Sequence, residues 1–334
     1  MKYILTADWH FSSYSSDKID NGTSLPERLS SLFLTIKNMI NYANDNEIKT
    51  IIILGDTFHN KSIIYSTAQS LLLDIVRDNE QIKWIFLTGN HDLSSMTGDG
   101  VSSTKCLDNE SNVITIHETT KIENMLFVPW NPKTMLSDIK NGEADYLFAH
   151  LGLNEGILNS GISLVSDIGL KDLKQYKSVY LGHYHTPQKI GNTTYVGNPT
   201  HLDWNDKNQE KRFIVFDSET SEEQSVPTTG YKKYCEFNIT EENKTEILKN
   251  ATELKNSGHY VKINKTNDLD VSEFEKDFDI IDKTEKDITN RGITSSMSIS
   301  DKLNRFLEIK EIPVEKREYY RNVALDIMES VSKC

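Results

Sequence analysis

The segment KWIFLTGNHDL (residues 83–93) begins as an apolar run and ends on a glycine, an asparagine, a histidine and an aspartate. Gly89 and Asn90 are ordinary turn residues, so His91 and Asp92 beside them could belong to a plain surface turn. The distinction depends on whether other apolar runs in the chain end in the same way. Several such ends together would indicate a shared site, because strand ends meet at one edge of a sheet.

Four further apolar runs end in polar clusters, and each is short, nearly continuous and rich in β-branched or aromatic residues. Runs of this kind are typical of strands buried on both faces of a sheet. They are KYILTAD (2–8), TIIILGD (50–56), DYLFAH (145–150) and SVYLGHYH (178–185). Between the early runs, residues 27–44 and 63–78 repeat apolar side chains at helical spacing. The alternation of strand and helix predicts a layered α/β fold with helices outside the sheet.

Shorter strands are predicted later in the chain, and we expect them to form a second sheet packed on the first. They are NVITIHE (112–118), MLFVPW (125–130), TTYVGN (193–198), RFIVFD (212–217) and EQSVP (223–227). The pattern then changes to strand, helix, strand. We expect a main domain at residues 1–230, a small α+β domain at 231–265, an acidic linker at 266–295 and C-terminal helices at 296–334.

Composition limits the function classes. The 334-residue chain has a formal net charge of −13, with 37% hydrophobic and 26% charged residues. These values suit a globular protein and speak against broad nucleic-acid binding by this chain alone, which needs a basic surface. They do not exclude an enzyme that acts on DNA, because carboxylates that hold metal ions count as negative while the ions are not counted. A partner subunit could also bring the basic surface.

Cysteine use and the N-terminus indicate a cytoplasmic location. The three cysteines, Cys106, Cys235 and Cys334, are far apart and odd in number, which fits a reducing compartment. Asp8 interrupts the first apolar run too early for a signal peptide. No stretch reaches the roughly twenty apolar residues of a membrane-spanning helix, so we expect no membrane association.

All five buried runs end in residue types that bind metal ions. In a strand, side chains two residues apart point the same way, so the two polar residues of DWH and of HYH should face one site. The glycines before Asp56, Asn90 and His183 should permit tight turns. The predicted ligands are Asp8, His10, Asp56, Asn90, His150, His183 and His185.

Seven ligands are too many for one tetrahedral ion. They suit two divalent ions about 4 Å apart that share one carboxylate. The mixed nitrogen and oxygen set favours manganese, iron or zinc over calcium or magnesium. Two dications carry four positive charges, and only Asp8 and Asp56 offset them. The remaining charge can hold a phosphate and a hydroxide, so the set predicts a two-metal phosphoesterase.

His91 is predicted to lie beside the ions without binding them. A histidine exchanges protons near neutral pH, so His91 could protonate a leaving oxygen. Asp92 is predicted to orient it. Any single histidine of this kind would more often be an ordinary polar residue, and a lone DxH or GDxxH is a weak signal. The combination is specific, because six of the nine histidines fall at these strand ends.

The order DxH, GDxxH, GNHD, H and GHxH resembles the calcineurin-like metallophosphoesterase superfamily over roughly residues 1–230. That resemblance implies a four-layer α-β-β-α sandwich with His91 as the acid. It implies that one metal ion binds Asp8, His10, Asp56 and His185, and that the other binds Asp56, Asn90, His150 and His183.

Within that superfamily, GDTFH followed by GNHD is similar to the SbcD-type DNA repair and recombination nucleases, in their phage branch. The resemblance implies that His59 lies near the substrate and that residues 231–265 are a DNA-capping domain. Among the metals that suit the ligand set, manganese is the one we expect. The resemblance also implies C-terminal helices that dock on an SbcC-type, SMC-like ATPase, and a homodimer within a heterotetramer.

Two other function classes share parts of this pattern. A small-molecule phosphodiesterase of the same superfamily would have the same ligands, but it would not need residues 231–334. A non-catalytic scaffold with the same sandwich should have lost ligands, and none is missing here. The sequence therefore favours a metal-dependent DNA nuclease.

Overall fold

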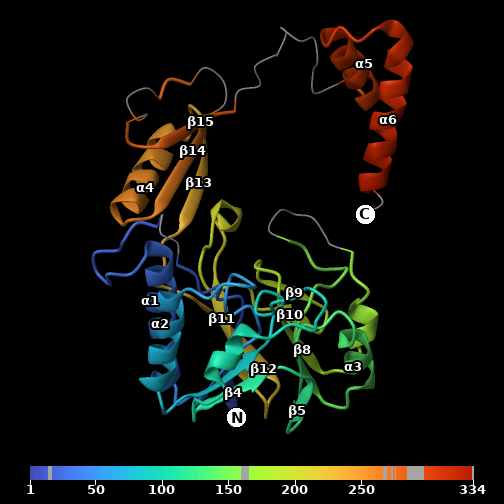
Figure 1. Ribbon diagram of the computed structural model, residues 1–334. Helices are drawn as coiled ribbons and strands as arrows, with labels where there is room; N and C mark the ends of the chain where they lie inside the picture. Colours follow the sequence, from blue (N-terminus) through green and yellow to red (C-terminus); the bar gives the residue numbers. More distant parts are fainter. Residues whose placement is uncertain are drawn as a thin grey trace. The chain divides into compact units, whose positions relative to one another are not determined.

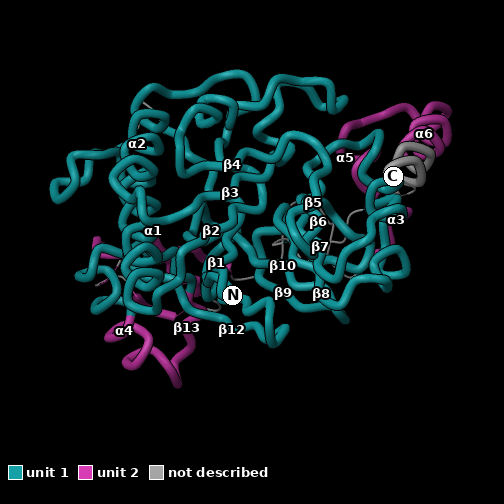
Figure 2. Tube along the Cα trace, turned by 90° about the horizontal axis from the view of Figure 1, so that it is seen from below, with its two compact units in different colours: residues 1–236, 251–261 teal, residues 237–250, 262–334 magenta. Residues whose placement is uncertain are grey.

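The computed structural model describes residues 1–13, 17–158, 165–265, 269–271, 274, 276–283 and 297–332, with the side chains of 325–332 left out. Contacts divide the chain into two compact units. One is Met1–Glu236 with Ala251–Val261, and the other is Phe237–Asn250 with Lys262–Cys334 (Figure 2).

The larger unit contains two six-stranded sheets (Figure 1). In the first sheet, β1 to β4 are parallel, while β11 runs antiparallel to β1 and β12 antiparallel to β11. Its strands, in spatial order, are β12 (Glu222–Pro227), β11 (Arg212–Asp217), β1 (Lys2–Thr6), β2 (Thr50–Ile53), β3 (Lys83–Leu87) and β4 (Val113–Ile116).

The second sheet has a parallel centre and antiparallel edges. Strands β6, β7, β8 and β10 are parallel, and β5 and β9 pair antiparallel at the two edges. In spatial order they are β5 (Thr120–Ile122), β6 (Met125–Val128), β7 (Tyr146–His150), β8 (Ser178–Gly182), β10 (Thr193–Tyr195) and β9 (Gln188–Ile190).

Three apolar clusters separate four layers. The first lies between the first sheet and helices α1 (Glu27–Asp45) and α2 (Ser66–Arg77). The second joins the facing sides of the two sheets, and the third lies between the second sheet and α3 (Met135–Asn141). Short 3-10 helices complete the connections: η1 (Ser103–Leu107), η2 (Leu170–Leu173) and η3 (Trp204–Asp206). The predicted four-layer α-β-β-α sandwich is confirmed, and Figure 2 shows its layers side by side.

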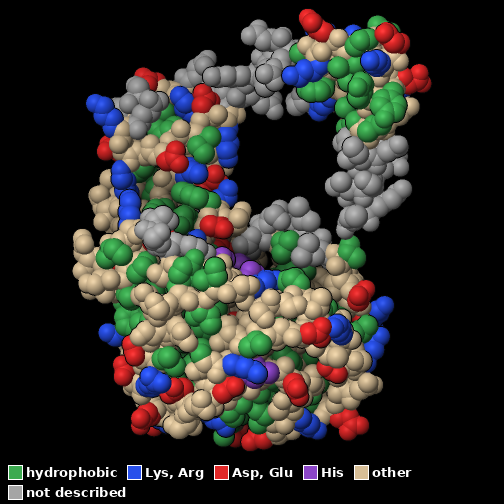
Figure 3. Space-filling model, viewed as in Figure 1, with side chains coloured by type: hydrophobic (Ala, Val, Ile, Leu, Met, Phe, Trp, Pro, Cys, Tyr) green, Lys and Arg blue, Asp and Glu red, His purple; other side chains and the backbone are tan. Residues whose placement is uncertain are grey.

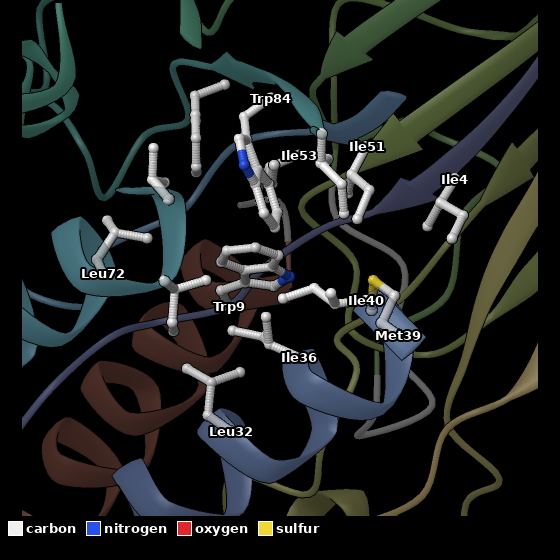
Figure 4. Close-up of a cluster of buried hydrophobic side chains, with 14 of the residues drawn as sticks. Ile4, Trp9, Leu32, Ile36, Met39, Ile40, Ile51, Ile53, Leu72 and Trp84 are labelled. Atoms are coloured by element: carbon white, nitrogen blue, oxygen red, sulfur yellow. The ribbon is translucent and has the colours of Figure 1, made fainter. Parts of the chain in front are cut away.

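Trp9 ties the first strand end to the core. Its ring is fully buried and meets Trp84 edge-on, with ring centroids 6.3 Å apart (Figure 4). Its Nε1 donates a hydrogen bond to Thr6 Oγ1 at 2.9 Å. Because Trp9 stands between Asp8 and His10, packing of this one side chain restricts both neighbours.

The predicted grouping of strands into sheets was partly wrong. β4, β11 and β12 were expected in the second sheet, but they extend the first one. The second sheet instead contains β7 and β8, which carry two of the polar strand ends. Local composition indicates that a strand is buried, whereas sheet membership depends on which distant strand it pairs with. The polar ends therefore meet from two sheets rather than from one.

A three-stranded sheet follows, with the order β13 (Tyr234–Ile239), β14 (Tyr260–Lys265) and β15 (Asp279–Asp282), and helix α4 (Lys244–Asn256) joins its first two strands. Strand β15 pairs parallel to β14, although the sequence predicted a linker at residues 266–295. The domain boundaries expected from the sequence stay a prediction.

The described chain ends with helices α5 (Ile299–Ile309) and α6 (Val314–Ser332). They present Phe306, Tyr319 and Tyr320 to solvent, and hydrophobic side chains are prominent on them in Figure 3. The side chains of residues 325–334 lie outside the described part. None of the helices described is long and apolar enough to cross a membrane.

Candidate metal centre

The structure brings all seven predicted ligands together at the carboxyl ends of the two sheets. The first sheet provides Asp8, His10, Asp56 and Asn90 from the turns after β1, β2 and β3, and the second provides His150, His183 and His185 from the ends of β7 and β8. Asp8, Asp56 and His150 are at most 2% exposed. Three ionisable groups buried so deeply need a compensating charge, which bound cations would supply.

The first group of donors surrounds one side of Asp56. The Nε2 atoms of His10 and His185 lie 3.1 Å apart, and His10 Nε2 is 3.9 Å from Asp56 Oδ2. A carboxylate oxygen of Asp8 and a ring nitrogen of each of these histidines all lie within 4.8 Å of one another.

The second group surrounds the other oxygen of the same carboxylate. Asn90 Oδ1 lies 2.9 Å from both His150 Nε2 and His183 Nδ1, and His150 Nε2 is 3.4 Å from Asp56 Oδ1. His150 Nδ1 faces the carbonyl oxygen of Leu54 at 2.8 Å, which leaves Nε2 directed at the site. Asp56 therefore turns one oxygen to each group, as a carboxylate shared by two ions requires.

Four of these residues adopt left-handed backbone conformations. The φ angles are 53° at Asp8, 51° at His10, 52° at Asp56 and 95° at His183. The prediction that DWH and HYH continue as extended strands was therefore wrong, since β1 ends at Thr6 and β8 at Gly182. The side chains face one site because the turns aim them there, and not because of strand alternation.

The glycines before the ligands have two different functions. Gly55 has a φ of +89°, as predicted for a tight turn. All three glycines, Gly55, Gly89 and Gly182, also leave no room for a side chain. A Cβ at Gly89 would lie 2.2 Å from Asp56 Oδ1, and one at Gly182 would lie 2.1 Å from the carbonyl oxygen of Leu54.

His91 and His59 lie beside the seven donors. His91 Nδ1 faces the carbonyl oxygen of His59 at 2.6 Å, and the His91 amide donates to Asp56 Oδ1 at 2.7 Å. His59 Nδ1 lies 3.3 Å from His10 Nδ1. The carbonyl of His59, which has no sequence signature, therefore holds the ring of the predicted acid.

Asp92 was predicted to orient His91, but its carboxylate mainly accepts hydrogen bonds from backbone amides, with one from Ser103 Oγ at 3.4 Å. Its carboxylate accepts from the amides of Thr57 (3.2 Å), Phe58 (3.0 Å) and Gly89 (2.9 Å), and it is fully buried. It thus fastens the turn after β2 to the turn after β3. These contacts favour a positioning role for Asp92, and its role in catalysis stays a prediction.

Burial and mutual charge shift the pKa values of the three buried carboxyl groups in opposite directions. Burial is the main reason why the pKa of Asp8 is raised to about 7, with His150 opposing and Asp56 adding to the effect. Burial and the charge of Asp56 also raise the pKa of Asp92 to about 7. Burial would raise the pKa of Asp56 too, but His150 and His10 hold it well below its usual range.

The pKa values of the buried histidines also shift in opposite directions. Burial lowers the pKa of His183 to about 3 and that of His185 to about 4. Both rings are therefore neutral at physiological pH, as metal binding requires. Burial alone would lower the pKa of His150 as well, but the charge of Asp56 raises it to about 9.

We expect metal ions to stabilise the protein more at pH 8 than at pH 5.5. The pKa of Asp8 is raised from 3.8 to about 7, so folded Asp8 keeps a proton that the unfolded chain loses. The stability of the metal-free protein therefore falls as the pH rises from about 3.8 to about 7. His150, raised from 6.5 to about 9, contributes stability below pH 6.5 that is lost as pH rises through 9. Binding must displace these protons, and each is worth about 1.4 kcal/mol per pH unit.

Thermal unfolding with a chelator and with excess Mn²⁺ at both pH values measures this effect. The gain in Tm should be larger at pH 8. Equal gains would show that no proton leaves on binding.

A buried ion pair supports the turn that carries His185. Lys211 is fully buried, and its Nζ donates to Asp206 Oδ1 (2.6 Å), Asn198 Oδ1 (2.5 Å) and the carbonyl oxygen of His185 (3.2 Å). Nothing in the run NQEKRF distinguished this lysine in the sequence. The hydrogen bond from Lys211 to the carbonyl oxygen of His185 restrains the backbone of this predicted ligand.

Lys211→Met is expected to lower the free energy of unfolding by about 3 kcal/mol, because Asp206 would stay buried without its cation. Urea denaturation measures the loss. The double variant Lys211→Met/Asp206→Asn removes the stranded charge and should recover part of it. A double variant less stable than the single one would contradict this account.

A buried donor set divided about a shared carboxylate defines a metal-dependent phosphoesterase. The profile of the calcineurin-like phosphoesterase family matches residues 1–241, and the chain belongs to this family. The superfamily and the enzyme class predicted from the motifs, a metal-dependent phosphodiester hydrolase, are confirmed.

Two relatives are named as nucleases. Exonuclease subunit 1 of Enterobacteria phage T4 is 29% identical over 248 residues, which cover 70% of each chain. The SbcD component of the SbcCD nuclease from Staphylococcus epidermidis is 22% identical over 308 residues, 80% of this chain and 79% of that one. The predicted similarity to SbcD-type nucleases is thereby confirmed.

Among solved structures, this chain is similar to an archaeal phosphodiesterase. That match has a TM-score of 0.33 and 13% sequence identity, and it covers 68% of this chain and 99% of the other. Nuclease MPE of Pseudomonas putida has a TM-score of 0.31, 14% identity and coverage of 67% and 87%.

Proposed function

We propose that this protein is a DNA nuclease that hydrolyses phosphodiester bonds with two divalent metal ions, and that it acts as the nuclease subunit of an SbcCD-like repair or recombination complex. The observation that carries the proposal is the pair of donor groups that share Asp56, with the non-ligand His91 beside them. The names of the two relatives, an exonuclease subunit and a nuclease subunit, support a nucleic acid as the substrate.

The residues of this chain divide the chemistry among them. One ion would be held by Asp8, His10, Asp56 and His185, and the other by Asp56, Asn90, His150 and His183. When bound, the ions supply Lewis acidity to the phosphate and lower the pKa of water. His91, held through Nδ1 by the carbonyl of His59, can deliver a proton from Nε2 to the leaving oxygen. Burial keeps His183 and His185 neutral, which suits them to an ion rather than to a proton.

Charge and exposed apolar surface support a partner. A net charge of −13 gives the chain little means of holding DNA by itself. Phe306, Tyr319 and Tyr320 on α5 and α6 are exposed, and an SbcC-type ATPase subunit is the partner we propose for these helices. A homodimer within a heterotetramer, a capping domain at residues 231–265, manganese as the ion and a cytoplasmic location belong to the same proposal.

A small-molecule phosphodiesterase of the same family remains the alternative, since it would share every ligand. The chain beyond residue 241, where the family match ends, favours the nuclease, because a small ester needs no further binding surface. The scaffold alternative lacks support, because all seven donors are present and meet.

The test is nuclease activity of the purified chain with Mn²⁺ on linear double-stranded and circular single-stranded DNA. Bis-p-nitrophenyl phosphate serves as the small substrate and a chelator as the control. Chelator-sensitive loss of DNA would support the nuclease. If only the small ester is hydrolysed, an SbcC-type ATPase is added, and DNA that stays intact would favour the small-molecule enzyme.

A further inference from the structure

A cleft of about 560 Å³ opens beside the metal centre, within the larger unit. His183, His185 and His59 line the part that belongs to the centre, while Arg28, Leu202 and Asp203 line the remainder. Among the described residues around the cleft, Arg28 is the cationic one. A substrate whose reacting phosphate lies at the metal centre would therefore extend past this guanidinium.

Arg28 is held in place from two directions. It lies in the first turn of α1, and its Nη2 donates to the carbonyl oxygen of Leu202 at 2.6 Å. The Leu202 amide in turn donates to Asp206 Oδ2 at 2.8 Å, and Asp206 is the partner of buried Lys211. The ion pair behind the metal centre thus also supports the carbonyl that positions Arg28.

The guanidinium is also close to the predicted ligands and to His59. Arg28 borders a narrow crevice together with His10, Ser12 and Thr200. Arg28 and His59 also line the larger cleft together.

One diester needs no cation beyond the metal ions, whereas a nucleic acid strand brings a second phosphate one nucleotide away. A guanidinium has five N–H donors, so it can serve a backbone carbonyl and a phosphate at once. We propose that Arg28 binds the phosphate next to the scissile one, and so makes the site select a diester within a nucleotide chain over an isolated diester. This inference rests on the proposed function and names its specificity residue.

Asp203 places a negative charge in the same cleft as Arg28. Its Oδ1 accepts the amide hydrogen of Asn205 at 2.7 Å at the start of η3, and its negative charge opposes a second phosphate. Asp203→Asn retains an oxygen for that hydrogen bond but removes the charge. If Arg28 binds a phosphate, this variant should strengthen the preference that Arg28→Gln weakens.

The test compares ligands that differ by one phosphate. The substrates are the 5′-p-nitrophenyl ester of thymidine 5′-phosphate and the same ester with a 3′-phosphate, and kcat/KM is measured with Mn²⁺. Binding of thymidine 3′,5′-bisphosphate and of thymidine 5′-phosphate is measured by calorimetry. We expect the wild type to favour the second phosphate in both assays, and Arg28→Gln to lower that preference about tenfold, as losing a charged hydrogen bond would.

Arg77→Gln is the matched control, because Arg77 pairs with Glu110 on an exposed surface and should keep the wild-type preference. Arg28→Lys retains the charge and should lose less than Arg28→Gln. A wild type that is indifferent to the second phosphate, or an Arg28→Gln variant that keeps the preference, would overturn the inference. If neither ester nor DNA is hydrolysed, the proposed function fails, and the calorimetric comparison still decides the role of Arg28.

Discussion

Asp56→Asn is expected to lower kcat by at least about 10⁴-fold on DNA and on bis-p-nitrophenyl phosphate alike. Asp56 is the residue that both donor groups share, through Oδ2 near His10 and Oδ1 near His150. An asparagine keeps one oxygen and presents an amide to the other group, so at most one ion should stay bound. Asp56 Oδ1 also accepts the His91 amide hydrogen, so losing the carboxylate charge weakens one restraint on the acid.

Metal content measured by mass spectrometry, together with the kinetics, checks this prediction. Wild type should bind two ions per chain and Asp56→Asn fewer. Asp145→Asn is the matched control, since that carboxylate pairs with Lys177 at the surface and should retain both ions. Two ions and near-normal turnover in Asp56→Asn would refute a shared carboxylate.

The second large effect is expected from His91→Ala, which should lower kcat on DNA by roughly 10³-fold. The deoxyribose oxygen that leaves from DNA is a poor leaving group and needs a proton. p-Nitrophenolate leaves without one, so bis-p-nitrophenyl phosphate should lose less than about tenfold in the same variant. Metal content should stay at the wild-type level, because the His91 ring lies beside the His10 ring without being one of the seven donors, and the His91 amide that contacts Asp56 is kept in the variant.

The loss of kcat on DNA, divided by the loss on bis-p-nitrophenyl phosphate, shows whether His91 protonates the leaving group. His117→Ala is a suitable control, as His117 contacts Thr88 and Asp108 away from the centre. Equal losses on both substrates would mean that His91 supports the metal site rather than protonating a leaving group.

The sequence predicted which polar side chains meet because their signal is local. Each of Asp8, Asp56, Asn90, His150 and His183 directly follows or ends a buried apolar run, and the parallel strands bring those ends together. The reason given for their alignment was wrong, since the backbone at Asp8 and His10 is left-handed. Residue types after a strand are visible in the sequence, but the turn that aims them is not.

What the sequence missed depends on long-range contacts. Strands β4 and β11 joined the other sheet because β3 and β1 provide their hydrogen-bonding partners. Lys211 belongs to a polar run that resembles any solvated loop, and only the fold shows it buried against Asp206. Asp92 adjoins His91 in the chain, yet its carboxylate meets amides from another turn.

The left-handed backbone at Asp8, His10, Asp56 and His183 has a consequence for the evolution of this protein. Such conformations cost a non-glycine residue of order 1 kcal/mol each, and the surrounding fold must supply that energy. Glycine would relieve the strain at any of the four positions while removing a donor. Selection for thermostability alone should therefore favour glycine at these four positions. The protein would then gain stability while it lost catalytic activity.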